Sequence, residues 1–323
     1  MKEFILNLKQ KILNGESITF DEAVTLLKVD EEDTNILFES SNEIRQKLAG
    51  KKANLCTILN ARSGKCSENC KYCAQSTHYN TEVLEYDLLD YEEILEKALE
   101  VQKNGAHRFS LVTSGKGIDR DKDIEKLSKI YQRLSEDTNL KLCASHGIIT
   151  YQQAKKLKDA GVSMYHHNIE TSSSHYKNIC TSHTYEDRIK TIENVKKAGM
   201  EVCCGGIIGM NESLEDRIRM AFEIKSLNIK SIPVNVLNPI KGTPFEDLKV
   251  LSPMEILKTM AVYRFILPDS YIRYAGGRMA LKDKQALGFK AGINAALTGN
   301  YLTTTGSNVD QDKDMIIEAG FSL

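Results

Sequence analysis

The stretch "NLCTILNARSGKCSENCKYCAQS", residues 54–76, joins a short run of β-forming residues to a loop that holds three cysteines. Residues 54–60 have the length and apolar composition of a buried strand. Cys66, Cys70 and Cys73 follow with the spacing CxxxCxxC. A closed zinc site or a complete iron–sulfur cluster takes four protein ligands, so three thiolates leave one coordination position open. The loop is therefore a candidate catalytic metal site.

The alternation of strand-like runs with capped helices continues along the chain. Capping sequences at 90–93, 150–153, 184–187 and 252–255 mark helix starts. Eight runs are rich in β-forming residues: 54–60, 107–113, 140–145, 163–170, 201–208, 231–237, 271–276 and 293–299. Strands that alternate with helices require a parallel sheet, and eight units in roughly 250 residues predict an α/β fold, a (β/α)8 TIM-type barrel. A doubly wound open sheet is the alternative.

The pattern divides the chain into three regions. Residues 1–50 are predicted to form an N-terminal helical extension, because the stretch from Thr19 to Glu22 is another capping box. Residues 51–300 are predicted to form the barrel, and residues 301–323 a short C-terminal extension packed on it. Active groups of such barrels lie in the loops after the strands, which is where the three cysteines lie.

The composition is that of a globular chain with balanced charge. Of 323 residues, 41% are hydrophobic and 27% charged, and 43 lysines and arginines nearly cancel 44 aspartates and glutamates. No strong field draws such a chain to nucleic acid or to an anionic membrane. The apolar run 4–6 is too short for a signal peptide, and no apolar stretch is long enough to cross a bilayer, so we expect a cytoplasmic protein. Eight cysteines in such a chain indicate metal ligands, redox groups or buried fillers rather than disulfides.

Thiolates are soft ligands that select iron–sulfur clusters, zinc or Cu(I). The position of the three cysteines in a predicted active-site loop favours a [4Fe-4S] cluster with three cysteine-bound irons and one free iron. A zinc site is the alternative, with His78 as a fourth ligand.

The spacing CxxxCxxC after the first strand resembles that of the radical S-adenosylmethionine (radical SAM) superfamily. Longer blocks resemble the biotin synthase family from about residue 50 to the end: "NARSGKCSENCKYCAQSTHY" (60–79), "HHNIETS" (166–172), "PVNVLNPIKGTP" (233–244) and "YIRYAGGR" (271–278). The resemblance implies that Cys66, Cys70 and Cys73 bind a [4Fe-4S] cluster whose free iron binds S-adenosylmethionine. The resulting 5′-deoxyadenosyl radical would serve to insert sulfur into dethiobiotin, which closes the thiophane ring of biotin.

The same resemblance implies which residues bind S-adenosylmethionine. Tyr72, between two of the cluster ligands, would lie beside the adenine. Asn168 and Glu170 alternate on the predicted fourth strand, so both side chains should point the same way, and a carboxylate suits ribose hydroxyls. Arg188, in the following helix, matches the arginine that pairs with the methionyl carboxylate.

Three later residues also match positions of the family that contact ligands. Gly205 and Gly206, on the predicted fifth strand, would let the backbone approach S-adenosylmethionine closely. Asn235, on the sixth strand, matches the residue that binds the ureido ring of dethiobiotin, because an amide offers both a donor and an acceptor.

The family's auxiliary iron–sulfur cluster, its sulfur donor, has an altered ligand set in this chain. Cys143, Cys203 and Arg273 match family ligands, but Ser110 stands where the family has a cysteine on the second strand. A neutral hydroxyl is a poor ligand for such a cluster. We expect Cys56, on the neighbouring first strand, to supply the missing thiolate, in an auxiliary cluster that need not be a standard [2Fe-2S] cluster.

Two other cysteines are less favoured replacements for the missing ligand, Cys204 and then Cys180. Burial as an apolar side chain is the plain alternative for each of them and for Cys56. His166 also stands where the family more often has asparagine.

The resemblance further implies dethiobiotin as substrate, a flavodoxin or ferredoxin as reductant, iron–sulfur assembly proteins as partners, and a homodimer. Two other functions stay open. A related radical SAM barrel enzyme, maturase-like, would act without sulfur insertion. A zinc-binding structural or interaction protein would use the cysteine loop without catalysis.

Overall fold

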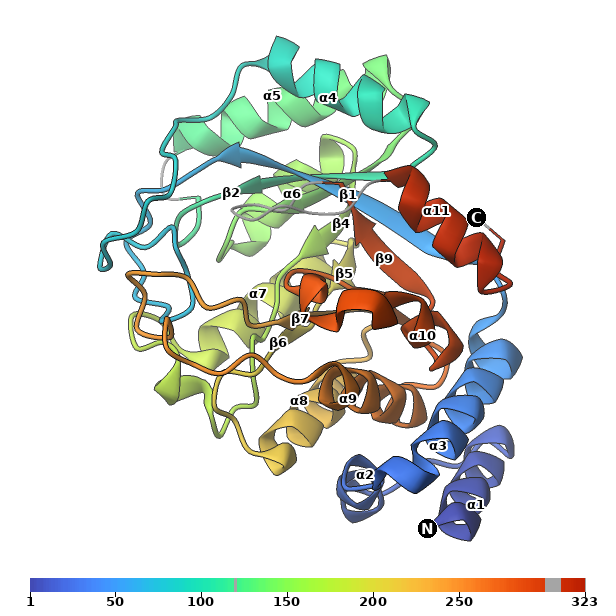
Figure 1. Cartoon of the computed structure of the whole chain (residues 1–323). Coiled ribbons are helices and arrows are strands. Elements are labelled where there is room, and N and C mark those ends of the chain that lie inside the picture. The colour runs from blue at the N-terminus through green and yellow to red at the C-terminus, as the bar shows by residue number, and fades with distance from the viewer. Residues whose placement is uncertain (119–120, 300–308, 323) are drawn as a thin grey trace.

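The computed structural model describes residues 1–118, 121–299 and 309–322, in which parallel strands form a closed barrel surrounded by helices (Figure 1). The strands are β1 (Asn54–Arg62), β2 (Arg108–Thr113), β3 (Lys141–Ser145), β4 (Val162–His166), β5 (Glu201–Cys203), β6 (Gly206–Ile208), β7 (Ser231–Val236), β8 (Tyr271–Tyr274) and β9 (Ala295–Thr298). The helices are α1 (Lys2–Leu13), α2 (Phe20–Leu27), α3 (Glu31–Ile44), α4 (Tyr91–Lys103), α5 (Asp121–Asp137), α6 (Tyr151–Asp159), α7 (Tyr185–Lys197), α8 (Leu214–Ser226), α9 (Pro253–Ile266), α10 (Gln285–Lys290) and α11 (Val309–Glu318). Short helical turns are η1 (Arg45–Ala49), η2 (Tyr176–Asn178) and η3 (Arg278–Lys284).

The barrel closes through one split strand. The strand order is β5-β4-β3-β2-β1-β9-β8-β7-β6, and β5 also pairs with β7. β5 and β6 are the two halves of the strand predicted over 201–208, so together they fill one of the eight barrel positions. This topology confirms the predicted (β/α)8 barrel and shows that the open sheet is wrong.

The split falls at Cys204 and Gly205, where the backbone passes close to its neighbours. A Cβ at Gly205 would lie 1.8 Å from the carbonyl oxygen of Pro233 on β7, and one at Gly206 would lie 2.4 Å from that of Glu170. Glycine is needed at both positions for this packing. Cys204 is fully buried in the main apolar core.

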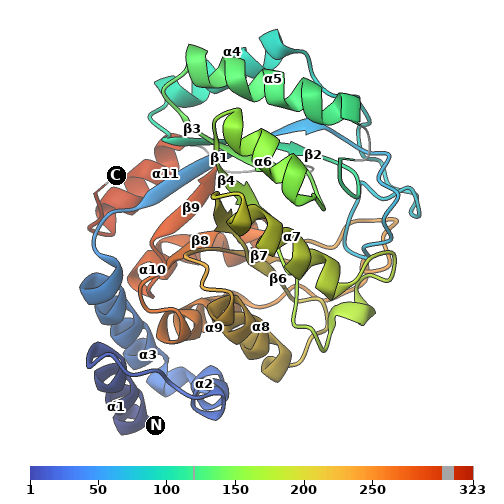
Figure 2. The same ribbon diagram turned by 180° about the vertical axis from the view of Figure 1, so that it is seen from behind.

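The helices begin where the capping sequences predict. Thr150, Thr184 and Ser252 each form a capping box at the start of α6, α7 and α9. α9 is buried along most of its length because the N-terminal helices α1 to α3 pack against it on the outside of the barrel (Figures 1 and 2). This packing makes the N-terminal helices part of the barrel's outer layer.

The end of the chain returns to the entry of β1. Ser322 donates its backbone N–H to the carbonyl oxygen of Lys51 at 3.1 Å and accepts from Ala53 at 2.8 Å. Of the predicted C-terminal extension, residues 301–308 and 323 lie outside the described residues. Of the helices in the described ranges, none combines the length and apolar composition needed to cross a membrane.

The loops at the C-terminal ends of the strands carry the residues of interest. The cysteine loop leaves β1 and reaches α4 at Tyr91. β4 ends at His166, earlier than predicted, so the placement of Asn168 and Glu170 on the strand is wrong. Glu170 has a φ of 67°, a left-handed conformation that cannot continue a strand.

Candidate active site

A cavity of about 410 Å³ lies inside the barrel and reaches the loops at the C-terminal ends of the strands. This volume is typical of small-molecule sites. Two sets of free thiols line it, the loop cysteines Cys66, Cys70 and Cys73 and the strand cysteines Cys56, Cys143 and Cys203. The fold therefore brings together the two cysteine sets that were predicted to bind separate clusters.

The cysteine loop is held in place by its own hydrogen bonds. Cys66 donates its backbone N–H to the carbonyl oxygen of Gln75 at 2.9 Å, and its carbonyl accepts from Thr77 at 2.8 Å. The side-chain oxygen of Gln75 accepts from the N–H of Gly64 at 3.0 Å. Tyr72 follows Cys70 and Lys71 on this loop and also lines the cavity. The loop thus fixes its thiols at the rim of the cavity.

The loop thiols suit a [4Fe-4S] cluster with three protein ligands. They are soft donors, they line one cavity, and none forms a disulfide. Burial raises the pKa of Cys66, and it raises the pKa of Cys73 to about 11. A buried thiol of this kind gives up its proton when a metal binds it.

His78 does not join the loop cysteines. Its side chain is exposed, and its Nε2 lies 3.0 Å from the carbonyl oxygen of Ser67. Across the described ranges, one group of three His, Cys, Asp or Glu side chains is close enough to hold a single ion, and it consists of Cys70, Cys180 and His183. The alternative of a zinc site with His78 as fourth ligand is therefore wrong.

Asn168, Glu170 and Arg188 meet on the cavity wall after β4. The amide of Asn168 donates to Glu170 Oε2 at 3.2 Å, and Arg188 Nη1 donates to Glu170 Oε1 at 3.3 Å and to the carbonyl oxygen of Asn168 at 3.0 Å. Arg188 is buried, with its Nε donating to the Tyr176 hydroxyl at 2.7 Å. The guanidinium and the carboxylate are thus held in fixed positions at the cavity.

Asn235 on β7 also lines the cavity, with its amide bound on both sides by backbone. Its Nδ2 donates to the carbonyl oxygen of Gly206 at 3.0 Å, and its Oδ1 accepts from the N–H of Gly276 at 2.9 Å. The side-chain oxygen of Asn168 accepts from the N–H of Gly205 at 3.0 Å. Gly205 and Gly206 therefore support two polar side chains of the site.

The strand cysteines lie beside an arginine in the barrel interior. Ser110 pairs with Cys143 across β2 and β3, whereas Cys56 on β1 is level with Arg108, two residues before Ser110. Arg108 Nη1 lies 3.6 Å from Cys143 Sγ. Cys56 is thus on the neighbouring strand of Ser110 but closer to the N-terminal end of the barrel.

The surroundings of the strand cysteines differ in their effect on the thiols. Burial alone would raise the pKa of Cys203, but its hydrogen bond with His166 and the charge of Arg273 lower it to about 7. Burial and the neighbouring Cys56 raise the pKa of Cys143 to about 12. Cys203 is therefore the strand thiol that loses its proton most readily.

Arg273, the predicted fourth ligand of the auxiliary cluster, also lines the cavity. Its Nη1 donates to the carbonyl oxygens of Asn54 and Ala296, each at 3.1 Å. These bonds tie the side chain to β1 and β9, and its role as a ligand stays a prediction.

Several residues near the site have almost no signal in the sequence. Glu68 is buried within the cysteine loop, His183 is buried beside it, and Arg108 reaches the strand cysteines. The spacing of Cys180 and His183, Cys-x-x-His, is the one local signal of a metal site among them. Cys180 lies beside Cys70 rather than among the strand cysteines, so it does not replace the missing auxiliary ligand.

Comparison with known families adds to this geometry. The model of the radical SAM superfamily matches residues 61–224, and that of the biotin and thiamin synthesis associated domain matches residues 233–322. Two solved structures share the fold. Methylornithine synthase (PylB) has a TM-score of 0.84 and 21% identity, and the match covers 98% of this chain and 96% of that chain. The FeFe-hydrogenase maturase HydG from Carboxydothermus hydrogenoformans has a TM-score of 0.82 and 20% identity, and the match covers 99% of this chain and 79% of that chain. At such identities they show the fold alone.

Two biotin synthases are much more similar to this chain in sequence. Biotin synthase from Clostridioides difficile (strain 630) is 59% identical over the full length of both chains. Biotin synthase from Acetivibrio thermocellus is 55% identical over 99% of this chain and all of the relative. This full-length identity, together with the two domain matches, shows that the chain belongs to the biotin synthase family of radical SAM enzymes.

Proposed function

We propose that this chain makes biotin by inserting one sulfur atom into dethiobiotin, with S-adenosylmethionine as the radical source. One observation carries the proposal: the loop cysteines and the strand cysteines line the same cavity, so a small substrate between them would contact both ends of the site. Membership of the biotin synthase family supports the same activity.

The loop cysteines and their neighbours would bind the cosubstrate. Cys66, Cys70 and Cys73 would hold a [4Fe-4S] cluster, which would supply one electron to bound S-adenosylmethionine. Tyr72 offers an aromatic face on the cavity wall against which the adenine packs.

The network after β4 would orient S-adenosylmethionine. Arg188 presents a fixed guanidinium to the methionyl carboxylate, and Glu170 accepts hydrogen bonds from the ribose hydroxyls. Asn168 holds the Glu170 carboxylate at 3.2 Å. Gly205 and Gly206 contribute by letting the backbone pack against this network.

Asn235 would position dethiobiotin. Because the backbone of β6 and the segment after β8 hold its amide, the side chain cannot turn away from the cavity. An amide so fixed still has one N–H and one lone pair, which complement the carbonyl and N–H groups of a cyclic urea.

The strand cysteines would hold the auxiliary cluster that donates sulfur. We assign Cys56, Cys143, Cys203 and Arg273 as its ligands, in a cluster that need not be a standard [2Fe-2S] cluster because Ser110 lacks a thiolate. Iron and sulfide analysis with Mössbauer spectroscopy of anaerobically reconstituted chain tests this assignment. We expect more iron per chain than the four atoms of the [4Fe-4S] cluster (the cube) on the loop cysteines. This additional iron should decrease in Cys56→Ala and stay unchanged in Cys204→Ala. Iron equal to the cube alone contradicts it.

The function itself is tested by an anaerobic assay with dethiobiotin, S-adenosylmethionine and a reductant. Biotin and 5′-deoxyadenosine should both form, and Cys70→Ala should abolish both. Cys204→Ala, which alters a buried thiol outside the cavity, is the control and should retain both products. Formation of 5′-deoxyadenosine without biotin contradicts the proposal and favours a related enzyme that does not insert sulfur.

The chain would also need partner proteins. A flavodoxin or ferredoxin would serve as reductant, iron–sulfur assembly proteins would rebuild the auxiliary cluster, and the chain would form a homodimer. The division into residues 1–50, 51–300 and 301–323 is part of the same proposal, as is a cytoplasmic location.

A further inference from the structure

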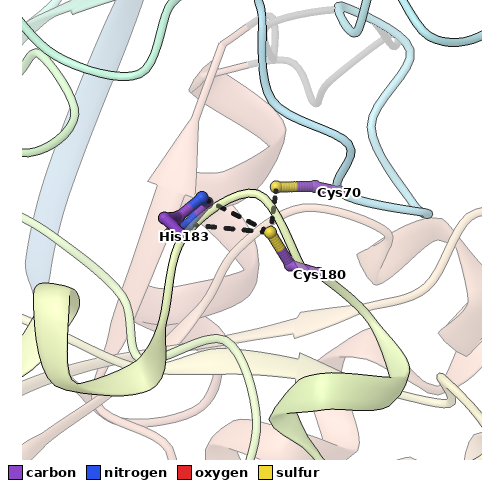
Figure 3. A group of neighbouring side chains, drawn as sticks. All are labelled: Cys70, Cys180 and His183. Atoms are coloured by element: carbon purple, nitrogen blue, oxygen red, sulfur yellow. Dashed lines mark hydrogen bonds between the residues drawn. The ribbon is translucent and has the colours of Figure 1, made fainter.

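Cys70, Cys180 and His183 form a compact group beside the cysteine loop (Figure 3). Cys70 comes from the loop after β1, whereas Cys180 and His183 come from the segment between η2 and α7. The Sγ atoms of the two cysteines are 3.6 Å apart, and Cys180 Sγ lies 3.4 Å from Nδ1 and 3.9 Å from Nε2 of His183. All three side chains are buried. The proposed reaction uses Cys70 and leaves the other two unexplained.

The spacings in this group are those of ligands around one metal ion. Tetrahedral zinc, with Zn–S bonds of about 2.3 Å and Zn–N bonds of about 2.0 Å, separates neighbouring ligand atoms by roughly 3.5–3.8 Å. The sulfurs here are 3.6 Å apart, Cys180 Sγ lies 3.9 Å from His183 Nε2, and one ligand atom of each residue lies within 4.8 Å of the other two. Thiolate and imidazole ligands suit Zn²⁺, whereas Mg²⁺ and Ca²⁺ take oxygen ligands.

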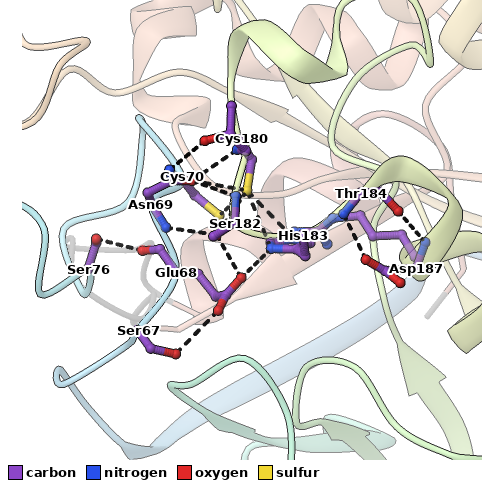
Figure 4. A network of polar contacts seen from close by, with 12 residues as sticks. Ser67, Glu68, Asn69, Cys70, Ser76, Cys180, Ser182, His183, Thr184 and Asp187 are labelled. Carbon is purple, nitrogen blue, oxygen red and sulfur yellow. Dashed lines mark hydrogen bonds and ion pairs between the residues drawn. The ribbon is translucent and has the colours of Figure 1, made fainter.

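A carboxylate holds the imidazole of the group in place (Figure 4). Glu68 Oε2 lies 2.6 Å from His183 Nδ1 and accepts from the Ser182 hydroxyl at 2.7 Å. With Nδ1 bound to Glu68, Nε2 is the nitrogen left to bind a metal. This arrangement of carboxylate, imidazole and metal recurs at zinc sites, where the carboxylate fixes the ring and makes it more basic.

The two segments that carry the ligands are joined by hydrogen bonds that need no iron–sulfur cluster. Asn69 Oδ1 accepts from the backbone N–H groups of Thr181 and Ser182, each at 3.0 Å, and the N–H of Asn69 donates to Ser182 Oγ at 3.0 Å. Lys71 donates its N–H to the carbonyl oxygen of Ile179 at 2.9 Å. The ligand group is therefore preformed by the protein.

We propose that Cys70, Cys180 and His183 bind one Zn²⁺ ion in the chain that lacks its iron–sulfur cube, with Glu68 supporting His183 and the fourth position open to water. Cys70 cannot serve this ion and the cube at once. Bound zinc therefore excludes the cube, and the chain accepts its cluster only after the ion has left. The exclusion rests on the proposed function, in which Cys70 is a cube ligand, whereas the zinc site itself does not.

The site is tested on the full-length chain freed of iron by a chelator, under anaerobic reducing conditions. Titration with Co²⁺, a spectroscopic substitute for zinc, should show one ion per chain with tetrahedral d–d bands and thiolate charge-transfer absorption. Equimolar Zn²⁺ should remove these bands. Absence of the thiolate absorption, or a stoichiometry of zero, overturns the proposal.

Single substitutions decide which side chains bind the ion. Cys180→Ala and His183→Ala should each weaken Zn²⁺ binding more than about a hundredfold, and Glu68→Gln about tenfold to a hundredfold. Cys66→Ala and the control Cys204→Ala should bind as the unaltered chain does. Undiminished binding in Cys180→Ala combined with loss in Cys66→Ala overturns the proposal, because the ion would then lie on the loop cysteines.

A second readout guards against a variant that simply fails to fold. Zn²⁺ should raise the melting temperature of the iron-free chain and of Cys204→Ala, because an ion that binds only the folded state stabilises it. The rise should disappear in His183→Asn even if its melting temperature without zinc is unchanged. An equal rise in His183→Asn overturns the site.

The exclusion is measured by rebuilding the cube with and without one equivalent of Zn²⁺. Zinc should lower the yield of cube in the unaltered chain and have no effect in His183→Ala. Full yield with zinc still bound overturns the exclusion. None of these measurements depends on biotin formation. Zinc binding can therefore be decided even if the chain proves not to make biotin.

Discussion

Glu170 shows how one backbone angle shapes the site. Its φ of 67° is rare for a residue with a side chain, and such conformations persist when the surrounding structure holds them. Here the carbonyl of Glu170 accepts from the N–H of Ile207 at 2.7 Å, and its carboxylate meets Asn168 and Arg188. The turn brings a carboxylate and a guanidinium to the cavity together.

Glu170→Gln should therefore weaken binding of S-adenosylmethionine. The substitution keeps the shape and removes the charge, and hydrogen bonds to a charged group contribute about 1.5–3 kcal/mol, so the affinity should fall roughly tenfold to a hundredfold. Equilibrium binding to the cluster-loaded chain measures it. Glu223→Gln is the matched control, because Glu223 accepts from Ser173 and Tyr185 and does not line the cavity. Equal affinities in the two variants would contradict the assigned role.

The split strand is the element that departs most from an ideal barrel. β5 and β6 are separated by Cys204 and Gly205, and both halves pair with β7. The sequence predicts one strand over 201–208 because its composition is β-forming throughout. The break depends on the approach of Pro233, which is distant in sequence, and no local pattern contains that contact.

Gly205→Ala should be strongly destabilising. The added Cβ would lie 1.8 Å from the carbonyl oxygen of Pro233, so the strands must separate, at a cost of about 2–3 kcal/mol or more in free energy of unfolding. Gly15→Ala is the comparison, because no atom lies within 4 Å of its Cβ and its φ of 88° alone costs about 1 kcal/mol. Urea denaturation of both variants measures the difference, and equal losses would argue against the close approach.

His146, after β3, links two strands and a helix. Its Nδ1 lies 2.9 Å from the Thr113 hydroxyl on β2, and its Nε2 lies 2.9 Å from the Tyr131 hydroxyl on α5. Burial, with a smaller effect of Arg62, lowers the pKa of His146 to about 3. The ring is therefore neutral in the folded chain throughout the ordinary pH range.

This burial predicts a loss of stability in mild acid. Between the unfolded pKa of about 6.5 and the folded pKa, His146 binds a proton in the unfolded chain but not in the folded chain. The contribution of His146 to the free energy of unfolding is therefore fully present above pH 6.5 and is lost as the pH falls below it. Between pH 7.5 and pH 5, the iron-free chain should lose about 2 kcal/mol more than His146→Gln does. Urea denaturation at both pH values measures it, and identical losses would show that His146 is not the cause.

Across the whole molecule, the N-terminal helices and the tail close the outside of the barrel. Leu37 on α3 is fully buried, and Ser41 on the same helix donates its hydroxyl to the carbonyl oxygen of Ala291 at 2.8 Å, with that of Ala261 3.3 Å away. α9 therefore lies between two layers. This packing predicts that the helices and the barrel unfold as one unit.

Leu37→Ala tests that prediction. Removing a buried leucine should lower the free energy of unfolding by about 2–5 kcal/mol, and the loss should reach the barrel strands. Because the chain has no tryptophan, hydrogen exchange with mass spectrometry is the suitable probe. Faster global exchange in β1 and β2 is expected, whereas strands that exchange as in the unaltered chain would show that the two parts unfold separately.

The overall architecture and the cysteines of the site are predictable from the sequence for physical reasons. Strand and helix periodicity is local, and the spacing of Cys66, Cys70 and Cys73 lies within one loop. The group of Cys70, Cys180 and His183 is different, because it joins loops more than a hundred residues apart that meet only in the folded barrel. Nothing in either loop alone indicates the other.

If the two cysteine sets on one cavity serve sulfur insertion, the sulfur of biotin should come from a cluster held by the chain. The most direct measurement is an anaerobic single-turnover assay of chain whose clusters are built with ³⁴S-sulfide, followed by mass spectrometry of the product. Biotin made by the unaltered chain should carry ³⁴S, and Cys56→Ala should lose most of the labelled biotin. Biotin with sulfur of natural isotopic composition, or 5′-deoxyadenosine with no biotin at all, would contradict it.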